Sequence, residues 1–298
     1  MPYDLHVREG DSIEWTAQGI EGHTVSFADT QQLLGLLTSY LIPDPQDSGS
    51  QLFNPDVALR SSASEVFAGD GSFVNSGFFG VPAEQTYTLT FTRRGVYQYL
   101  CLVHPLWMRG TVSVDAPDAQ VAAPESVEAK GKQLLAQYVD EEERALAQAT
   151  AATRDVPGPE GTTLHRVAVG LTTPYGQVAA FVKPVLDVNA GDTVIFESDD
   201  RDFHNVVFKG DLPDPPSGII VHPDPQGRGI NFALDRRSAD AVDPPTGGFD
   251  EHTFLSSGSL GIFMPRSTWR LRFDQPGTYV YACTIHVLAG MAGVVRVH

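Results

Sequence analysis

Two short stretches of the chain each combine a thiol, an imidazole and a thioether. The first reads CLVHPLWM from Cys101 to Met108, and the second reads CTIHVLAGM from Cys283 to Met291. In both, a histidine follows the cysteine by three residues, and a methionine follows that histidine by four or five. Thiolate and imidazole ligands with a weak axial thioether are typical of electron-transfer copper sites.

Each stretch also has a second imidazole far upstream. His23 precedes Cys101 by almost the same separation as His204 precedes Cys283. Three ligands on one loop can converge on one point, and we expect the fourth to come from a neighbouring strand. The predicted metal ligands are His23, Cys101, His104 and Met108 in the first set, and His204, Cys283, His286 and Met291 in the second.

Three other interpretations of these residues are core packing, zinc and a disulfide. A lone buried cysteine or methionine usually only fills a core. Zinc rarely takes one thiolate, two imidazoles and a thioether. The two cysteines, Cys101 and Cys283, could form one disulfide. The matching ligand pattern around both of them favours two copper thiolates instead.

The two ligand sets belong to an internal repeat. The Gly-Asp pair at 10–11 and His23 recur at 191–192 and His204, both at the same offset. The segment that leads into the cysteine recurs at an offset one position longer. Matching blocks in the same order, at nearly one offset, indicate duplicated domains.

The repeated blocks have the alternation of β-strands. Polar and apolar residues alternate in Thr86–Phe91 and again in Thr268–Phe273. The chain also contains 28 glycines and 21 prolines, which favours a turn-rich β protein over a helical bundle. We therefore predict an all-β fold with one β-sandwich in each repeat.

The repeats set the expected domain boundaries. Residues 1–115 form the first domain, 116–160 a linker and 161–298 the second domain. Strong helix formers with an apolar stripe predict a helix over about 125–153 inside the linker. When the two repeats are aligned, Met1 corresponds to Val182, so we expect the first domain to lack its opening strand.

Both repeats resemble cupredoxins, the family of plastocyanin, azurin and pseudoazurin. The Cys-x2-His-x4-Met loop at Cys283 has plastocyanin-like spacing, and the shorter step from His104 to Met108 is azurin-like. The resemblance implies two tandem Greek-key β-sandwiches joined by a helical linker. It also implies one type 1, or blue, copper in each repeat.

The resemblance further implies a hydrogen bond between two side chains beside the thiolate. In the family, the residue after the upstream histidine is often Asn, bonded to a Ser or Thr after the cysteine. The second repeat has Asn205 and Thr284, whereas the first has Thr24 and Leu102. Because hydrogen bonds around a metal ligand tune the metal, we expect two different reduction potentials.

Multicopper oxidases and copper nitrite reductases are multidomain relatives of cupredoxins. Their additional coppers need His-x-His pairs or a histidine directly before the cysteine. This chain has no His-x-His, and Leu100 and Ala282 precede the two cysteines. We therefore expect an electron carrier with no catalytic residues. An oxidase or reductase with an extra interface copper remains an alternative, and His222 and His252 are its candidate ligands.

A copper-storage module and an oligomeric scaffold are further alternatives. Storage favours Met-rich or His-rich tracts, but the chain has only four methionines. A trimer would match the two-domain relatives, although intact ligand sets in both repeats speak against incidental copper.

Charge limits the expected partners. The chain has 37 acidic and 20 basic residues, a net charge of −17. This disfavours nucleic-acid binding and suits a cationic redox protein. The resemblance places electron transfer at apolar residues around the downstream histidines. Those residues are Pro105, Leu106, Trp107, Val287 and Leu288.

The sequence shows no run that could span a membrane and no signal peptide at its N-terminus. The resemblance nevertheless implies a periplasmic or cell-surface protein. We expect no membrane span.

Overall fold

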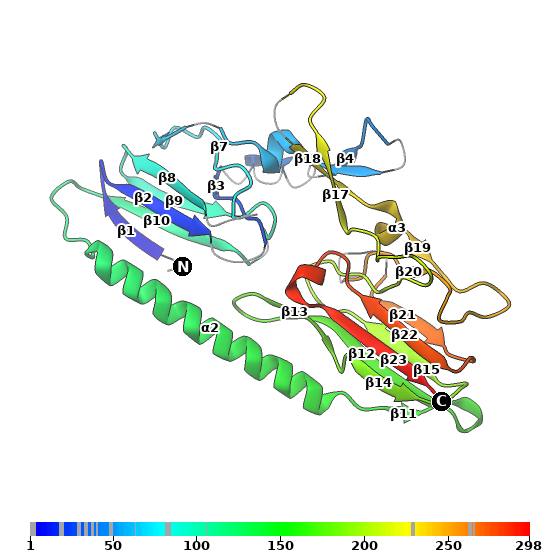
Figure 1. The fold of residues 1–298 in the computed structure, drawn as a ribbon. Coiled ribbons are helices and arrows are strands. Elements are labelled where there is room, and N and C mark those ends of the chain that lie inside the picture. The colour runs from blue at the N-terminus through cyan, green and yellow to red at the C-terminus, as the bar shows by residue number, and fades with distance from the viewer. Residues whose placement is uncertain are drawn as a thin grey trace. The chain divides into compact units, whose positions relative to one another are not determined.

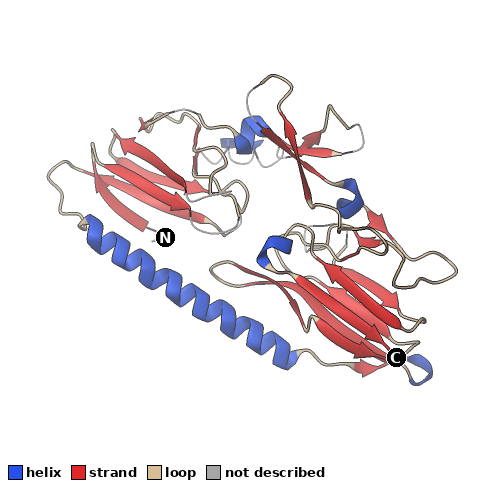
Figure 2. Cartoon of the chain, in the orientation of Figure 1, coloured by secondary structure: helices blue, strands red, loops and turns tan. Residues whose placement is uncertain are grey.

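The structure, a computed structural model, describes most of the chain. The described residues are 4–17, 21–28, 31–32, 35–36, 39, 41–47, 50–62, 64–80, 85–105, 107–227, 230–261, 264 and 266–298. Strands dominate these residues, as Figure 2 shows. The all-β fold predicted from the sequence is confirmed.

The chain divides into two compact units whose bounds differ from those of the repeats. Unit 1 consists of Met1–Val139 and His222–Phe232. Unit 2 consists of Asp140–Val221 and Ala233–His298. A short segment of the second repeat therefore belongs to unit 1.

Unit 1 contains a five-stranded and a three-stranded sheet. The five-stranded sheet has the order β1 (Asp4–Arg8), β10 (Arg109–Asp115), β9 (Gly95–Leu100), β3 (Ser26–Phe27) and β7 (Val74–Asn75). The three-stranded sheet has the order β2 (Ser12–Ala17), β8 (Gln85–Phe91) and β6 (Val66–Phe67). Strand β2 forms because its residues alternate, with Ile13, Trp15 and Ala17 buried.

A four-stranded sheet joins two hairpins. Its order is β17 (Ile219–Pro223), β18 (Ile230–Leu234), β5 (Gln51–Phe53) and β4 (Leu41–Pro43). Arg60 forms an ion pair with the buried Asp224, and Nε2 of His222 lies 3.4 Å from the buried Asp44 carboxylate. These contacts hold the segment 222–232 within unit 1.

Unit 2 contains a six-stranded and a five-stranded sheet. The six-stranded sheet has the order β14 (Val185–Val188), β23 (Ala292–Val297), β22 (Gly277–Ala282), β16 (Val207–Phe208), β20 (Leu255–Ser257) and β19 (Ala241–Val242). The other has the order β11 (Val156–Pro157), β12 (Thr163–Thr172), β15 (Thr193–Glu197) and β21 (Thr268–Arg272), with β13 (Gln177–Val182) paired to β12. Strands β12 and β13 precede β14, the counterpart of β1. The described residues of unit 1 contain no equivalent of either strand.

One long helix, α2 (Pro124–Ala152), follows β10 (Figure 1). It begins at a proline, which is well tolerated in the first turn. None of its 29 residues is buried. No helix in the described part of the chain is long and apolar enough to cross a membrane. Other helical segments among the described residues are short and include η1 (Pro55–Leu59), η2 (Pro159–Gly161), α3 (Arg236–Ala239) and η3 (Val287–Ala289).

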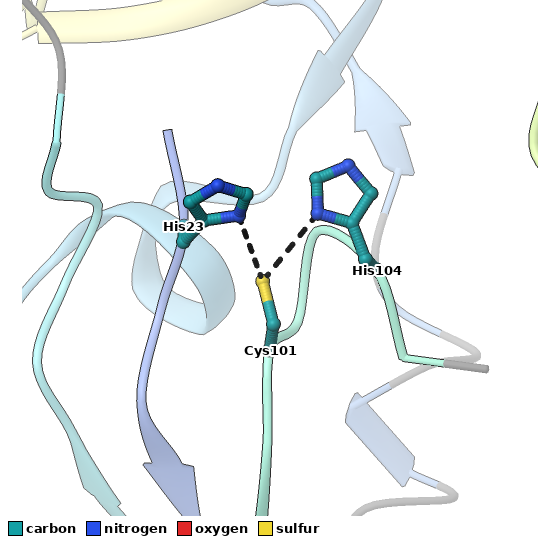
Figure 3. Close-up of side chains that lie close together, drawn as sticks. All are labelled: His23, Cys101 and His104. Carbon is teal, nitrogen blue, oxygen red and sulfur yellow. Dashed lines mark hydrogen bonds between the residues drawn. The ribbon is translucent and has the colours of Figure 1, made fainter. Parts of the chain in front are cut away.

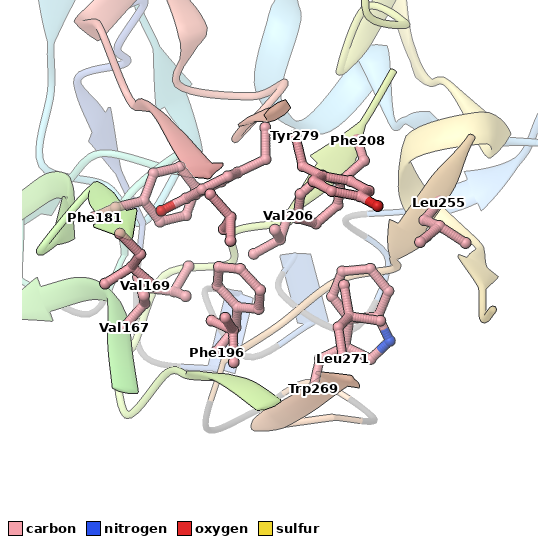
Figure 4. Packing of buried hydrophobic residues seen from close by; sticks show 14 of the residues in the cluster. Val167, Val169, Phe181, Phe196, Val206, Phe208, Leu255, Trp269, Leu271 and Tyr279 are labelled. Carbon is pink, nitrogen blue, oxygen red and sulfur yellow. The ribbon is translucent and has the colours of Figure 1, made fainter. Parts of the chain in front are cut away.

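Aromatic side chains fill the core of each unit. In unit 1, Trp15 lies edge-on to Tyr99, with ring centroids 5.6 Å apart. In unit 2, Phe196 packs against Tyr281 at 5.2 Å, within the cluster drawn in Figure 4. Cys283 and Met291 belong to that same buried cluster. The core of unit 2 therefore directly supports the predicted metal ligands.

Candidate metal centres

The structure brings each cysteine together with two histidines. Sγ of Cys101 lies 4.0 Å from Nδ1 of His23 and 3.8 Å from Nδ1 of His104. In Figure 3 both imidazole rings turn a nitrogen toward this sulfur. We call this group the first centre.

The second centre repeats this arrangement in unit 2. Sγ of Cys283 lies 4.0 Å from Nδ1 of His204 and 3.5 Å from Nδ1 of His286. All three residues are buried, whereas His23 of the first centre is only partly buried. The two groups are the only clusters of three or more histidine, cysteine or acidic residues suited to a metal ion among the described residues.

The donor atoms fit a single metal ion. Two ligand atoms about 2.0 and 2.3 Å from one first-row metal lie about 3.5 to 3.7 Å apart at tetrahedral to trigonal angles. The sulfur–nitrogen distances of 3.5 to 4.0 Å lie at or just above that range. One thiolate and two Nδ1 atoms, facing a common point, match a trigonal copper set.

The strands explain how distant residues meet. Each cysteine directly follows a strand, β9 or β22, and its nearer histidine lies in the loop beyond it. Each upstream histidine is held before β3 or β16 by an isolated bridge, between His23 and Phe79 or between His204 and Leu260. The long spacing between histidine and cysteine thus reflects two neighbouring strands, one that follows the histidine and one that precedes the cysteine.

Backbone hydrogen bonds close each ligand loop at its methionine. The amide of Cys101 donates to the carbonyl of Met108 at 2.8 Å, and that of Cys283 to Met291 at 3.0 Å. Met291 is buried at 1% exposure, and Met108 is half-buried. Both methionines therefore lie at the base of a loop that carries a cysteine and a histidine.

Comparison with known proteins identifies the family. A family model described as "Copper binding proteins, plastocyanin/azurin family" matches residues 167–298. Plastocyanin of Vicia faba is 30% identical over 119 residues, which are 40% of this chain and 88% of that plastocyanin. The chain belongs to the plastocyanin/azurin family. The family resemblance predicted from the ligand loops is confirmed.

Other plastocyanin/azurin-family proteins are also similar to the chain. Plastocyanin of Ginkgo biloba is 27% identical over 123 residues, 41% of this chain and 92% of its own length. Among solved structures, a Cu(I) amicyanin mutant is 20% identical, covering 45% of this chain and 82% of its own, with a TM-score of 0.26. A mutant fern plastocyanin is 23% identical, covering 45% and 99%, with a TM-score of 0.25.

The side chain after the upstream histidine differs between the two centres. In the second, the buried Asn205 donates to Thr284 Oγ1 at 2.9 Å, and the Thr284 amide donates to Asn205 Oδ1 at 2.8 Å. In the first, Thr24 Oγ1 likewise accepts from the Leu102 amide at 2.7 Å, but Leu102 has no side-chain donor or acceptor to bond to Thr24. The Thr24 amide donates to the Cys101 sulfur at 3.3 Å. Both centres thus join their two segments through the amide after the cysteine, and the second centre adds a bond between two side chains.

A carboxylate beside the second centre was not predicted from the sequence. Oδ2 of Asp200 lies 2.9 Å from Nε2 of His204, and both residues are fully buried. Its only sequence signal is a position four residues before the histidine. In the first centre a carboxylate lies on the other imidazole, since Glu21 is 3.7 Å from Nε2 of His104.

These surroundings give the metal-free thiols opposite pKa shifts. Burial raises the pKa of Cys101 and lowers the pKa of His23. Burial also raises the pKa of Cys283, but hydrogen bonds from His204 and His286 outweigh it and lower that pKa to about 5. Burial lowers the pKa of His204, yet Asp200 and Cys283 raise it to about 9. Without metal, the first centre favours neutral groups and the second an ion pair.

Apolar residues surround the downstream histidine of each centre. Val287 and Leu288 of η3 are 41% and 78% exposed, beside the buried His286. In the first centre, the rings of Trp107 and His104 lie 6.2 Å apart. Trp107 and Pro105 are both half-buried. Leu106 lies outside the described residues.

The two histidines considered for an additional copper each lie beside a carboxylate. His222 is near Asp44, and Nδ1 of His252 lies 2.7 Å from the exposed Asp211. Neither belongs to a metal-suited cluster within the described ranges.

Proposed function

We propose that this chain is an electron-transfer protein that holds one type 1 copper in each repeat and relays electrons between redox proteins. The observation that carries the proposal is the pair of Cys–His–His clusters, each closed by a methionine-bearing loop. Membership of the plastocyanin/azurin family adds support for copper as the metal.

The chain offers four ligands to each copper. The first set is His23, Cys101, His104 and Met108, and the second is His204, Cys283, His286 and Met291. Copper would supply a one-electron couple between Cu(II) and Cu(I). The protein's residues hold the ligands in one geometry and keep water out, since Cys101, Cys283 and three of the four imidazoles are buried. A fixed geometry suits fast electron transfer because little must rearrange.

Electrons would pass through the downstream imidazoles. The exposed Val287 and Leu288 form an apolar surface next to His286, suited to brief contact with a partner. The net charge of −17 favours a cationic partner. By analogy with other cupredoxins, the setting would be the periplasm or the cell surface.

The first test is an optical spectrum with copper and zinc quantitation on the oxidised protein. We expect an intense thiolate-to-copper band and about two coppers per chain. Cys101→Ser and Cys283→Ser should each remove about one copper and one part of the band, and each serves as the other's control. Zinc in place of copper, or no coloured band, would contradict the proposal. Copper clearly above two per chain would favour an enzyme with an interface copper.

A further inference from the structure

The buried Asp200 contacts the side of His204 that faces away from the thiolate. Nδ1 of His204 faces Cys283 Sγ, while Nε2 lies 2.9 Å from Asp200 Oδ2. Both side chains are completely buried, so no water screens the contact. The imidazole is thus fixed between the sulfur and a carboxylate.

A second element holds this carboxylate in place. Thr172, the last residue of β12, donates its hydroxyl to Asp200 Oδ1 at 2.6 Å. The Asp202 amide donates to the same oxygen at 3.3 Å. Oδ1 of Asp200 therefore accepts from Thr172 and Asp202, and Oδ2 contacts the imidazole.

The backbone of β12 makes room for the pair. The pairing register of β12 with β13 shifts between Val169 and Leu171, which leaves Gly170 at a φ of +73°. A Cβ at this glycine would overlap both Nε2 of His204 and Oδ2 of Asp200. Only glycine tolerates both that space and that φ.

The first centre lacks this arrangement in its sequence. The position that corresponds to Asp200 in the first repeat is Gly19, which has no side chain. Strands β12 and β13 have no equivalents among the described residues of unit 1. Nor do those residues give His23 a carboxylate partner. The two centres therefore differ by one buried negative charge next to the upstream imidazole.

We propose that Asp200 is a positioning residue that orients His204 and lowers the reduction potential of the second centre. A carboxylate on the far nitrogen makes the imidazole a stronger donor. A stronger donor and a nearby negative charge both stabilise Cu(II) more than Cu(I), because Cu(II) carries the larger charge. This inference rests on the proposed copper function, and it concerns the second centre alone.

The test uses Cys101→Ser as a background, so that only the second centre reports. In this background Asp200→Asn keeps the shape but removes the charge. We expect the equilibrium to shift toward Cu(I) by at least tenfold, a rise of about 59 mV for one electron. The matched control is Asp199→Asn, which removes an equal charge at the exposed neighbouring residue. It should change the equilibrium less than twofold.

For a third variant we expect the reduction potential to change in the opposite direction. Thr172→Val removes the hydroxyl that donates to Asp200, so the carboxylate acts more strongly on His204 and the potential should fall. Equal shifts for Asp200→Asn and Asp199→Asn would overturn the inference. If Asp200→Asn loses its copper, an unchanged or raised potential in Thr172→Val would overturn it instead.

The background protein separates the two proposals. If Cys101→Ser with an intact Asp200 has no blue band, the copper function itself fails. If it binds copper and cycles normally, but its potential ignores Asp200, only the positioning role fails.

Discussion

The two cysteines lie in similar stretches of sequence, but the pKa values of their thiols shift in opposite directions. Hydrogen bonds from His204 and His286 lower the pKa of Cys283 to about 5, whereas burial raises the pKa of Cys101. A group with a lowered pKa is ionised above that pKa. At pH 7 the metal-free protein should therefore contain one thiolate and one thiol.

Ultraviolet absorption of the thiolate tests this prediction in the metal-free protein. The signal should rise with a midpoint near pH 5 and reach about one thiolate per chain at neutral pH. Cys283→Ser should remove it, and Cys101→Ser should leave it. Two thiolates at pH 7, or none, would contradict the assignment.

The sequence predicted that each cysteine would lie beside two histidines, because most of that information is local. The loop from Cys283 to Met291 carries three of the four predicted ligands, and the repeat points to His204 as the remaining one. Asp200 and Gly170 escaped prediction because their roles depend on contacts between segments that are well separated in the chain. No spacing rule links a glycine on one strand to a carboxylate in a later turn.

At the scale of elements, strand β21 shows why alternation predicts this fold. Trp269 and Leu271 are buried, while their neighbours in the strand are exposed. Leu271 has no exposed surface, so Leu271→Ala should lower the free energy of unfolding by about 2 to 5 kcal/mol. Val280 on β22 is 53% exposed, and Val280→Ala should change it by no more than about 0.5 kcal/mol.

Denaturant unfolding of the metal-free protein, followed by tryptophan fluorescence, compares the two variants. Trp269 lies in the same core as Leu271 and reports on it directly. Similar unfolding midpoints for the two alanine variants would show that burial of Leu271 does not stabilise the fold as expected.

The pairing of hairpins was harder to predict than the strands themselves. The sequence Pro-Asp-Pro-Gln occurs at 43–46 and again at 223–226. Each copy turns a hairpin, and the structure places both hairpins in one sheet. Sequence likeness marks them as repeats, but strands of three to five residues do not by themselves specify their partners.

At the scale of the whole molecule, the chain passes between the two units three times. The passages follow Val139, Val221 and Phe232. The first lies within α2, which has no buried residue, so the helix can unfold locally at little cost and become accessible to a protease. Trypsin should cut at Lys130, Lys132 or Arg144.

Such a cut should nick the molecule without dividing it. The segment 222–232 stays in unit 1 through its sheet and through the Arg60–Asp224 ion pair. Native size-exclusion chromatography should therefore show both fragments in one peak, and denaturant should separate them. Separate peaks under native conditions would contradict this. Uncut protein is the control.

The four-stranded sheet of β17, β18, β5 and β4 also determines how a shortened chain would behave. Strand β5 is paired on one side by β4 and on the other by β18. A chain that ended before Ile219 would leave one side of β5 without its partner. An open strand edge readily accepts a strand from another molecule, so the first repeat made alone should be prone to self-association. In the intact chain, strand β18 of the second repeat covers this edge of the first.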